Sequence, residues 1–251
     1  MLSKNLIKSI RKLHQKKYRL QELKFIAEGT KIVDEIIRSG YAVEHIFATQ
    51  AWIDVYKKTG LPTEYIEPAE VYELQQISCL QTVPEVVCIC SIPSTPQVSS
   101  GSGLSVYLDS VRDPGNLGTI LRLADWFNID AVYASADTVE WTNPKCIQAS
   151  MGSFLRIIPQ VVAVEDLARL KETASFFAAD LQGENLFNAE FVPQGILIVS
   201  SESHGLSSYL EPLINMRLTI PKFRNAHSAA ESLNVASALA IFLSEFNRRK
   251  L

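Results

Sequence analysis

Polar residues gather in three segments of this sequence, and each segment directly follows a predicted buried strand. The first is DSVRDPGNLGTILR, in which a Pro-Gly turn leads into a predicted helix and Asn116 can cap that helix. Arg122 lies nearly two turns further on, so it shares a ligand with Asn116 only if the loop folds back. The alternative is a simple turn and cap, with Arg122 paired to Asp125 one helical turn later.

The second segment, VSSESHGLS, begins at Val199 and ends at Ser207. Gly205 permits a positive φ angle, and successive backbone N–H groups of such a turn can hold a ligand. Glu202 is the one acidic residue of the segment. The alternative is an ordinary connecting turn that carries a solvated carboxylate.

The third segment leads into a C-terminal helix predicted over 229–249. Ser228 and Glu231 match the S-x-x-E capping box, which gives both residues a structural explanation. That cap leaves Ser232 and Asn234 unexplained, because asparagine is a poor helix former in a first turn. The surplus of polar side chains predicts a binding site at the N-terminus of this helix.

Strands and helices alternate along most of the chain, which predicts an α/β fold with a mostly parallel sheet covered on both faces. In the C-terminal part, strands are predicted at 104–108, 131–134, 156–161, 175–179, 195–200 and 217–220, with helices at 116–127, 164–172 and 229–249. In such sheets ligands bind beyond the carboxyl ends of the strands, which is where the three segments lie.

A stretch rich in Ser, Pro and Gly, SIPSTPQVSSGSGLS, separates two predicted domains. Residues 1–95 are expected to form a small α/β domain that opens with a basic helix over 4–18. Residues 96–104 form the linker, and residues 105–251 form the larger domain. The length of 251 residues suits this division.

Charge is distributed unevenly along the chain. The net charge is −3, yet residues 1–24 contain eight Lys or Arg residues and one acidic residue, Glu22. A basic arm on an acidic body indicates contact with a polyanion such as RNA, for which the predicted contacts are Arg11, Lys12, Lys16 and Lys17. The alternative is a solvated helix face.

Composition also restricts the location of the protein. No apolar run approaches the roughly 18–20 residues of a membrane span. The N-terminus lacks the apolar core of a signal peptide, and the four cysteines show no zinc-ligand spacing. A cytoplasmic protein with free thiols and no metal is expected.

Together the three segments resemble the three motifs of the SpoU (TrmH-type) family of RNA ribose 2′-O-methyltransferases, in the SPOUT superfamily. DPGNLGTILRLADWF resembles the first motif, VSSESHGLS the second, and IP followed by ESLNVASALA the third. FIAEGTKIVDEI and ISCLQT are similar to phrases of the family's substrate-binding domain. The resemblance therefore extends over nearly the whole chain.

The resemblance implies a C-terminal domain with a deep trefoil knot, S-adenosylmethionine as cofactor, and a homodimer that methylates RNA. The separate N-terminal domain and the basic arm favour ribosomal RNA over transfer RNA. The resemblance implies that the cofactor is held by Val199, Ser200, Ser201, Glu202, Gly205, Ile220, Ser232 and Leu233. It assigns catalysis to Asn116, Arg122, Glu202, Ser232 and Asn234.

Arg122 is the central catalytic residue that the resemblance implies. A guanidinium is effectively always charged, so Arg122 is expected to bind the target phosphate and stabilise a developing alkoxide. Ser200 and Ser203 stand where the family usually has glycine. They leave open an alternative, a non-catalytic RNA-binding or ribosome-assembly protein with a relic cofactor pocket.

Overall fold

The computed structural model of the chain describes residues 1–58, 66–94, 103–201, 205–223 and 231–251. The chain forms two compact units. The first contains Met1–Ser94 and Glu140–Leu155, and the second contains Thr95–Val139 and Arg156–Leu251. The first unit thus includes residues 140–155, which the predicted division at 96–104 assigned to the larger domain. Most of the predicted linker lies outside the described residues.

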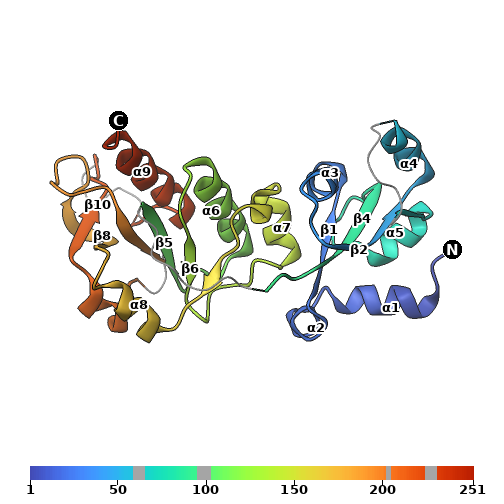
Figure 1. The fold of residues 1–251 in the computed structure, drawn as a ribbon, viewed down its shortest axis with the longest axis horizontal. Helices are drawn as coiled ribbons and strands as arrows, with labels where there is room; N and C mark the ends of the chain where they lie inside the picture. The colour runs from blue at the N-terminus through green and yellow to red at the C-terminus, as the bar shows by residue number, and fades with distance from the viewer. Residues whose placement is uncertain (59–65, 95–102, 202–204, 224–230) are drawn as a thin grey trace. The chain divides into compact units, whose positions relative to one another are not determined.

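A four-stranded mixed sheet, in the order β1-β4-β2-β3, forms the centre of the first unit (Figure 1). β4 pairs antiparallel with β1 and β2, whereas β2 and β3 are parallel. Its elements in chain order are α1 (Lys4–Lys12), α2 (Lys16–Glu22), β1 (Lys24–Glu28), α3 (Thr30–Arg38), β2 (Val43–Ala48), α4 (Gln50–Lys57), β3 (Ile66–Pro68), α5 (Val71–Ile77) and β4 (Val86–Ser91).

The basic helix predicted over 4–18 is instead two helices, α1 and α2, separated by a turn. The Arg19 guanidinium donates to the carbonyl oxygens of Leu13 at 2.8 Å and His14 at 2.9 Å. These bonds satisfy the carbonyl groups that a continuous helix would have used itself. Arg19 is 1% exposed and also pairs with Glu140, so this member of the basic arm is structural.

The segment from Glu140 to Leu155 completes the core of the first unit with α7 (Pro144–Ser150) and the 3-10 helix η1 (Ser153–Leu155). The Phe25 ring packs edge-on against Trp141 at 5.2 Å and Phe154 at 5.7 Å between centroids. Gln148 Nε2 donates to the backbone oxygen of Glu28 at 2.8 Å. These contacts bury aromatic surface that residues 1–94 alone cannot cover.

The second unit is built on a six-stranded sheet in the order β10-β8-β9-β5-β6-β7, and all of its strand pairs are parallel. This confirms the predicted α/β fold with a parallel sheet. Its elements are β5 (Leu104–Asp109), α6 (Pro114–Trp126), β6 (Val132–Ala134), β7 (Gln160–Val161), α8 (Val164–Leu170), β8 (Phe176–Asn185), β9 (Gly195–Ser200), the 3-10 helix η2 (Ser208–Leu213), β10 (Met216–Thr219) and α9 (Val235–Arg248).

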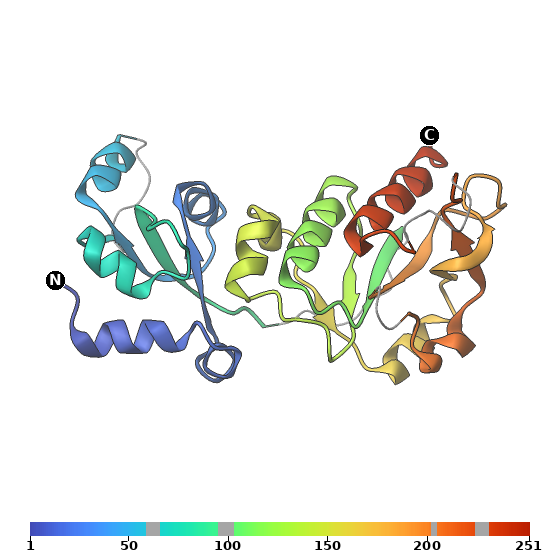
Figure 2. The ribbon, with the colours of Figure 1, turned by 180° about the vertical axis from the view of Figure 1, so that it is seen from behind.

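The two faces of this sheet carry different helices. α6 and α9 lie side by side on one face, and α8 and η2 lie on the other (Figures 1 and 2). Covering both faces explains why every residue of the central strand β5 is buried. None of the helices in the described ranges has the length and apolar character of a bilayer span. The chain path through 202–204 and 224–230 lies outside the described residues, so the trefoil knot stays a prediction.

The last turn of α9 is fixed to the unit by ion pairs of the buried Glu245. The carboxylate accepts hydrogen bonds from Arg248 Nε at 2.7 Å and Arg249 Nε at 2.8 Å. Arg249 also donates to the backbone oxygens of Leu186 and Ala189, both at 2.6 Å. The hydrogen bonds from Arg248 and Arg249 outweigh the opposing effect of burial and lower the pKa of Glu245 to about 2.

Because this pKa lies below the value in the unfolded chain, the stabilisation is complete above about pH 4.3 and is lost as the pH falls towards 2. We expect Glu245→Gln to lower the free energy of unfolding at pH 7 by roughly 1–3 kcal/mol. In urea unfolding followed by circular dichroism, the difference in the free energy of unfolding between the variant and the wild type should become smaller between pH 4 and pH 3. The exposed Glu172→Gln serves as the control and should show no such pH dependence. A Glu245→Gln deficit that is constant with pH would contradict the assignment.

Candidate cofactor cavity and active site

A cavity of about 550 Å³ opens in the second unit beside the neighbouring strands β10, β8 and β9. Its walls are formed by residues at and beyond the ends of β9 and β10, by residues 179–181 of β8, and by residues 232–242 at the start of α9. The volume lies within the range of small-molecule sites in proteins. Its position follows the rule for parallel sheets, whose ligands bind beyond the carboxyl ends of the strands.

Seven of the eight predicted cofactor residues line this one cavity. They are Val199, Ser200, Ser201, Gly205, Ile220, Ser232 and Leu233. The eighth, Glu202, lies outside the described residues. The fold thus brings residues from three separate segments to one space, and their role in binding stays a prediction.

The cavity offers the surfaces that S-adenosylmethionine requires. Val235, Ile241 and Phe242 present apolar surface for a flat purine ring. Among the described lining residues, Lys222 and Asp180, which is paired with Arg217, are the charged groups near which the zwitterionic amino-acid end could lie. The cavity keeps its volume with the Ser200 side chain in its wall, so this serine does not close it.

A long bulge in β8 forms one wall, and the sequence did not predict it. β8 pairs with β10 at Ala178↔Arg217 and then at Glu184↔Leu218, so the five residues between them leave the ladder. A Cβ atom on Gly183 would lie 2.7 Å from the backbone of Arg217, so this close approach needs glycine. Asp180 lies on the bulge and was missed, although its position just after a predicted strand was a usable signal.

Asn234 has a structural role that the sequence did not predict. It is the N-cap of α9, and its Oδ1 accepts from the backbone N–H groups of Ala236 at 3.1 Å and Ser237 at 3.3 Å. The predicted helix start at 229 is therefore wrong, and Glu231 is exposed ahead of the cap. Ser228 lies outside the described residues. Asparagine is among the preferred N-cap residues, which explains why the helix begins here.

The sequence predicted Asn116 as the cap of its helix, and this prediction is wrong. The cap of α6 is Asp113, whose carboxylate accepts from the backbone N–H of Asn116 at 2.7 Å. The Asn116 side chain is therefore available for another contact, and its Oδ1 accepts from Asn234 Nδ2 at 2.9 Å. This bond joins the N-terminal ends of α6 and α9, so two predicted catalytic residues meet.

Arg122 lies in α6, and its side chain is exposed. The alternative pairing with Asp125 is wrong, because Asp125 pairs with Arg156 at 2.7 Å. Within the described ranges, no hydrogen bond or ion pair of the Arg122 side chain is present, and none joins it to Asn116.

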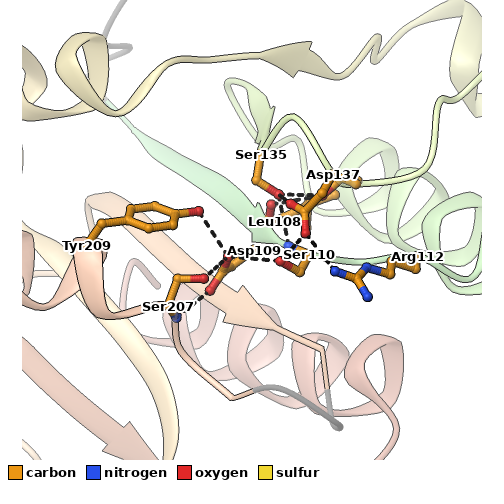
Figure 3. Close-up of polar contacts among 9 residues, drawn as sticks. Leu108, Asp109, Ser110, Arg112, Ser135, Asp137, Ser207 and Tyr209 are labelled. Atoms are coloured by element: carbon orange, nitrogen blue, oxygen red, sulfur yellow. Dashed lines mark hydrogen bonds and ion pairs between the residues drawn. The ribbon is translucent and has the colours of Figure 1, made fainter.

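Asp109, at the end of β5, holds the segment that follows β9 (Figure 3). Its buried carboxylate accepts from the backbone N–H of Ser207 at 2.7 Å, from Ser207 Oγ at 2.8 Å and from Tyr209 OH at 3.2 Å. Its backbone oxygen accepts from the N–H of Ser201 at 3.1 Å. One residue therefore fixes both ends of the predicted second motif.

A second carboxylate, Asp137, lies on the other side of the same strand end (Figure 3). It accepts from Ser135 Oγ and Ser110 Oγ, both at 2.7 Å, and from Arg112 Nη2 at 3.0 Å. The serine hydroxyls first, and then Arg112, lower the pKa of Asp137 to about 2. This cluster holds Ser110 in a left-handed conformation, with φ at +58°.

The first unit presents a basic groove of about 500 Å³ along α1, lined by Lys4, Ile7, Lys8, Arg11, Lys12, His14 and Gln15. Arg11 and Lys12, two of the four predicted RNA contacts, belong to it. The Lys17 ammonium lies 5.8 Å from the centre of the Tyr18 ring. Lys16 is 3.5 Å from the Glu140 carboxylate, which offsets part of its charge.

Comparisons with known proteins agree with this architecture. The structure is similar to a putative RNA methyltransferase of the TrmH family from Porphyromonas gingivalis, with 35% identity, 99% of each chain covered and a TM-score of 0.88. It is also similar to the AdoMet-bound rRNA methyltransferase from Sinorhizobium meliloti, with 27% identity, coverage of 100% of this chain and 97% of the other, and a TM-score of 0.85.

The sequence is 28% identical over 248 residues to the 23S rRNA (guanosine(2553)-2′-O)-methyltransferase RlmP of Bacillus subtilis, covering 94% of each chain. Residues 4–97 match the MRM3-like substrate binding domain. Residues 103–244 match the SpoU rRNA Methylase family and include all three motif segments. The predicted resemblance is confirmed, and the chain belongs to the SpoU rRNA Methylase family.

Proposed function

We propose that this protein is an S-adenosylmethionine-dependent RNA ribose 2′-O-methyltransferase that acts on ribosomal RNA. The observation that carries the proposal is the meeting of the second and third motif segments around one cavity of about 550 Å³. Two relatives support the substrate and the cofactor, since one is a 23S rRNA 2′-O-methyltransferase and another is an AdoMet-bound rRNA methyltransferase.

The chemistry requires in-line placement of a ribose hydroxyl and control of its proton. S-adenosylmethionine supplies an activated methyl group on a positively charged sulfur. Arg122 binds the phosphate beside the target ribose and stabilises negative charge on the attacking oxygen. The bonded pair of Asn116 and Asn234 orients the ribose at the helix N-termini. Glu202 positions Arg122 or the substrate in this proposal.

The groove along α1 would bind the RNA backbone. Lys4, Lys8, Arg11 and Lys12 line it without an acidic residue among its walls, and Ile7 gives it an apolar floor. Such a surface suits a phosphate chain, because each neutralised phosphate releases bound counterions. Lys16 contributes less, since Glu140 already neutralises part of its charge.

The family resemblance and one exposed side chain support a homodimer. Trp126 is 84% exposed on the same helix as Arg122, and an aromatic ring of this size is an unusual surface residue. Contact with a second copy would remove it from water. The cytoplasm is the proposed compartment, because Cys88 and Cys90 are free thiols with sulfur atoms only 3.4 Å apart.

The function is tested by mapping ribose 2′-O-methyl groups in ribosomal and transfer RNA from cells with and without the protein. The expected result is the loss of methylation at a ribosomal RNA position and its return when the wild-type protein is restored. An unchanged map, together with no binding of S-adenosylmethionine in calorimetry, would support the non-catalytic alternative instead.

Arg122→Ala should lower the rate of methyl transfer by about 1000-fold, because it removes the positive charge that stabilises the transition state. Affinity for S-adenosylmethionine should stay near that of the wild type, since Arg122 does not line the cavity. The measurement is transfer of a labelled methyl group to ribosomal RNA. Arg169→Ala, which removes an exposed arginine paired with Asp166, serves as the control. A rate close to that of the wild type would remove Arg122 from the mechanism.

Replacing Arg11 and Lys12 by glutamine should weaken RNA binding and reduce its dependence on salt. Each lost phosphate contact lowers the slope of log affinity against log salt by about 0.7–0.9. Lys16→Gln should have a smaller effect, because Lys16 is paired with Glu140. Filter binding at several salt concentrations measures the slopes, with the exposed Lys31→Gln as the control. If Arg11 and Lys12 prove no more important than Lys31, the groove is only a solvated face.

A further inference from the structure

We propose that Asp109 is the positioning residue for the cofactor, an inference that rests on the proposed function. Asp109 is directly bonded to both ends of the second motif, at Ser201 through its backbone and at Ser207 through its side chain. It does not itself line the cavity. It acts instead by holding the backbone of the residues that do.

The carboxylate and the motif depend on one another energetically. Asp109 is fully buried, and its hydrogen-bond donors in the described part of the chain are uncharged. Burying a carboxylate without a cation is costly unless hydrogen bonds compensate it. The shortest of these bonds come from Ser207, at 2.7 and 2.8 Å. Moving Ser207 away would leave the buried carboxylate with only the longer bonds from Tyr209 and Ser110, so the carboxylate resists that movement.

The hydrogen bonds to Asp109 involve residues that line the cavity or are adjacent to lining residues in the sequence. Ser201 lines the cavity and donates its backbone N–H to Asp109. Gly205 and Leu206 line the cavity and come immediately before Ser207. A displacement of Ser207 is therefore passed directly to two residues in the cavity wall. Sites of this kind tolerate little displacement, because binding depends on groups held close to their productive positions.

Asp137 provides a matched comparison for Asp109. Asp109 ends β5 and Asp137 lies in the turn that follows β6, and both carboxylates bond to serine hydroxyls in the same region (Figure 3). The partners of Asp137 are Ser110, Ser135 and Arg112, none of which lines the cavity. Loss of Asp137 should therefore disturb the strand ends but leave the cavity wall in place. Loss of Asp109 should disturb the strand ends and also move the cavity wall.

The test compares Asp109→Asn, Ser207→Ala and Asp137→Asn in the full-length protein. Calorimetry measures the Kd for S-adenosylmethionine, filter binding the Kd for ribosomal RNA, and thermal unfolding the stability. Asp109→Asn should raise the Kd for S-adenosylmethionine by about 10–100-fold, as expected when hydrogen bonds to a charged group are lost. Ser207→Ala should raise it by a smaller factor. In both variants the Kd for RNA and the KM for RNA should stay near those of the wild type.

Asp137→Asn should lower the unfolding temperature but leave the Kd for S-adenosylmethionine unchanged. Equal changes in that Kd for Asp109→Asn and Asp137→Asn would overturn the proposal, and so would an unchanged Kd in Asp109→Asn. If Asp109→Asn does not fold, Ser207→Ala decides, because Ser207 lies near the surface and an unchanged Kd there rejects the proposal. A wild-type protein that binds no S-adenosylmethionine would overturn the proposed function itself, which separates the two failures.

Discussion

The buried charge of Asp109 is the interaction on which the arrangement of the second unit depends. A parallel sheet places the ends of its strands along one edge, but it does not determine how the loops beyond that edge fold. Asp109 constrains these loops, because its buried carboxylate is stabilised by hydrogen bonds from Ser207 and Tyr209. The segment after β9 is thereby attached to the end of β5, the neighbouring strand.

The two ends of the candidate site are organised by different means. The cofactor cavity is shaped by backbone at strand ends, by the bulge in β8 and by apolar side chains of α9. The proposed catalytic side is formed by two helix N-termini, where Asn116 and Asn234 meet. The Arg122 side chain is exposed on α6. The cavity is lined by residues of the second and third motifs, whereas Arg122 belongs to the first motif and does not line it.

Local patterns predicted most of the regular structure. The strands at 104–108 and 195–200 and the helix at 116–127 are continuous apolar or amphipathic runs, and they are found within two residues of their predicted limits. The failures have non-local causes. β8 continues to Asn185 only because its polar second half pairs with β10, more than thirty residues later. The basic helix breaks because the Arg19 guanidinium takes its carbonyl groups.

The site shows the same division between local and non-local information. Family resemblance identified seven residues of the cavity wall, but it gave no role to Asp109, whose bonding partner Ser207 is 98 residues away. The S-x-x-E pattern at Ser228 and Glu231 predicted the helix cap at the wrong position. Asn234 was therefore predicted to be a site residue and not the cap. Spacing alone does not distinguish a cap from a catalytic side chain, since both require a polar residue at a helix start.

The first unit is built from two segments that are far apart in the sequence, and this affects when it can fold during translation. Phe25 and Arg19 are synthesised early, yet their partners Trp141, Phe154 and Glu140 emerge only after β5, α6 and β6 have been made. The N-terminal unit therefore cannot close its core as an independent first step of translation. Its completion has to wait for the first half of the methyltransferase unit, so the substrate-binding and catalytic parts of this enzyme mature together.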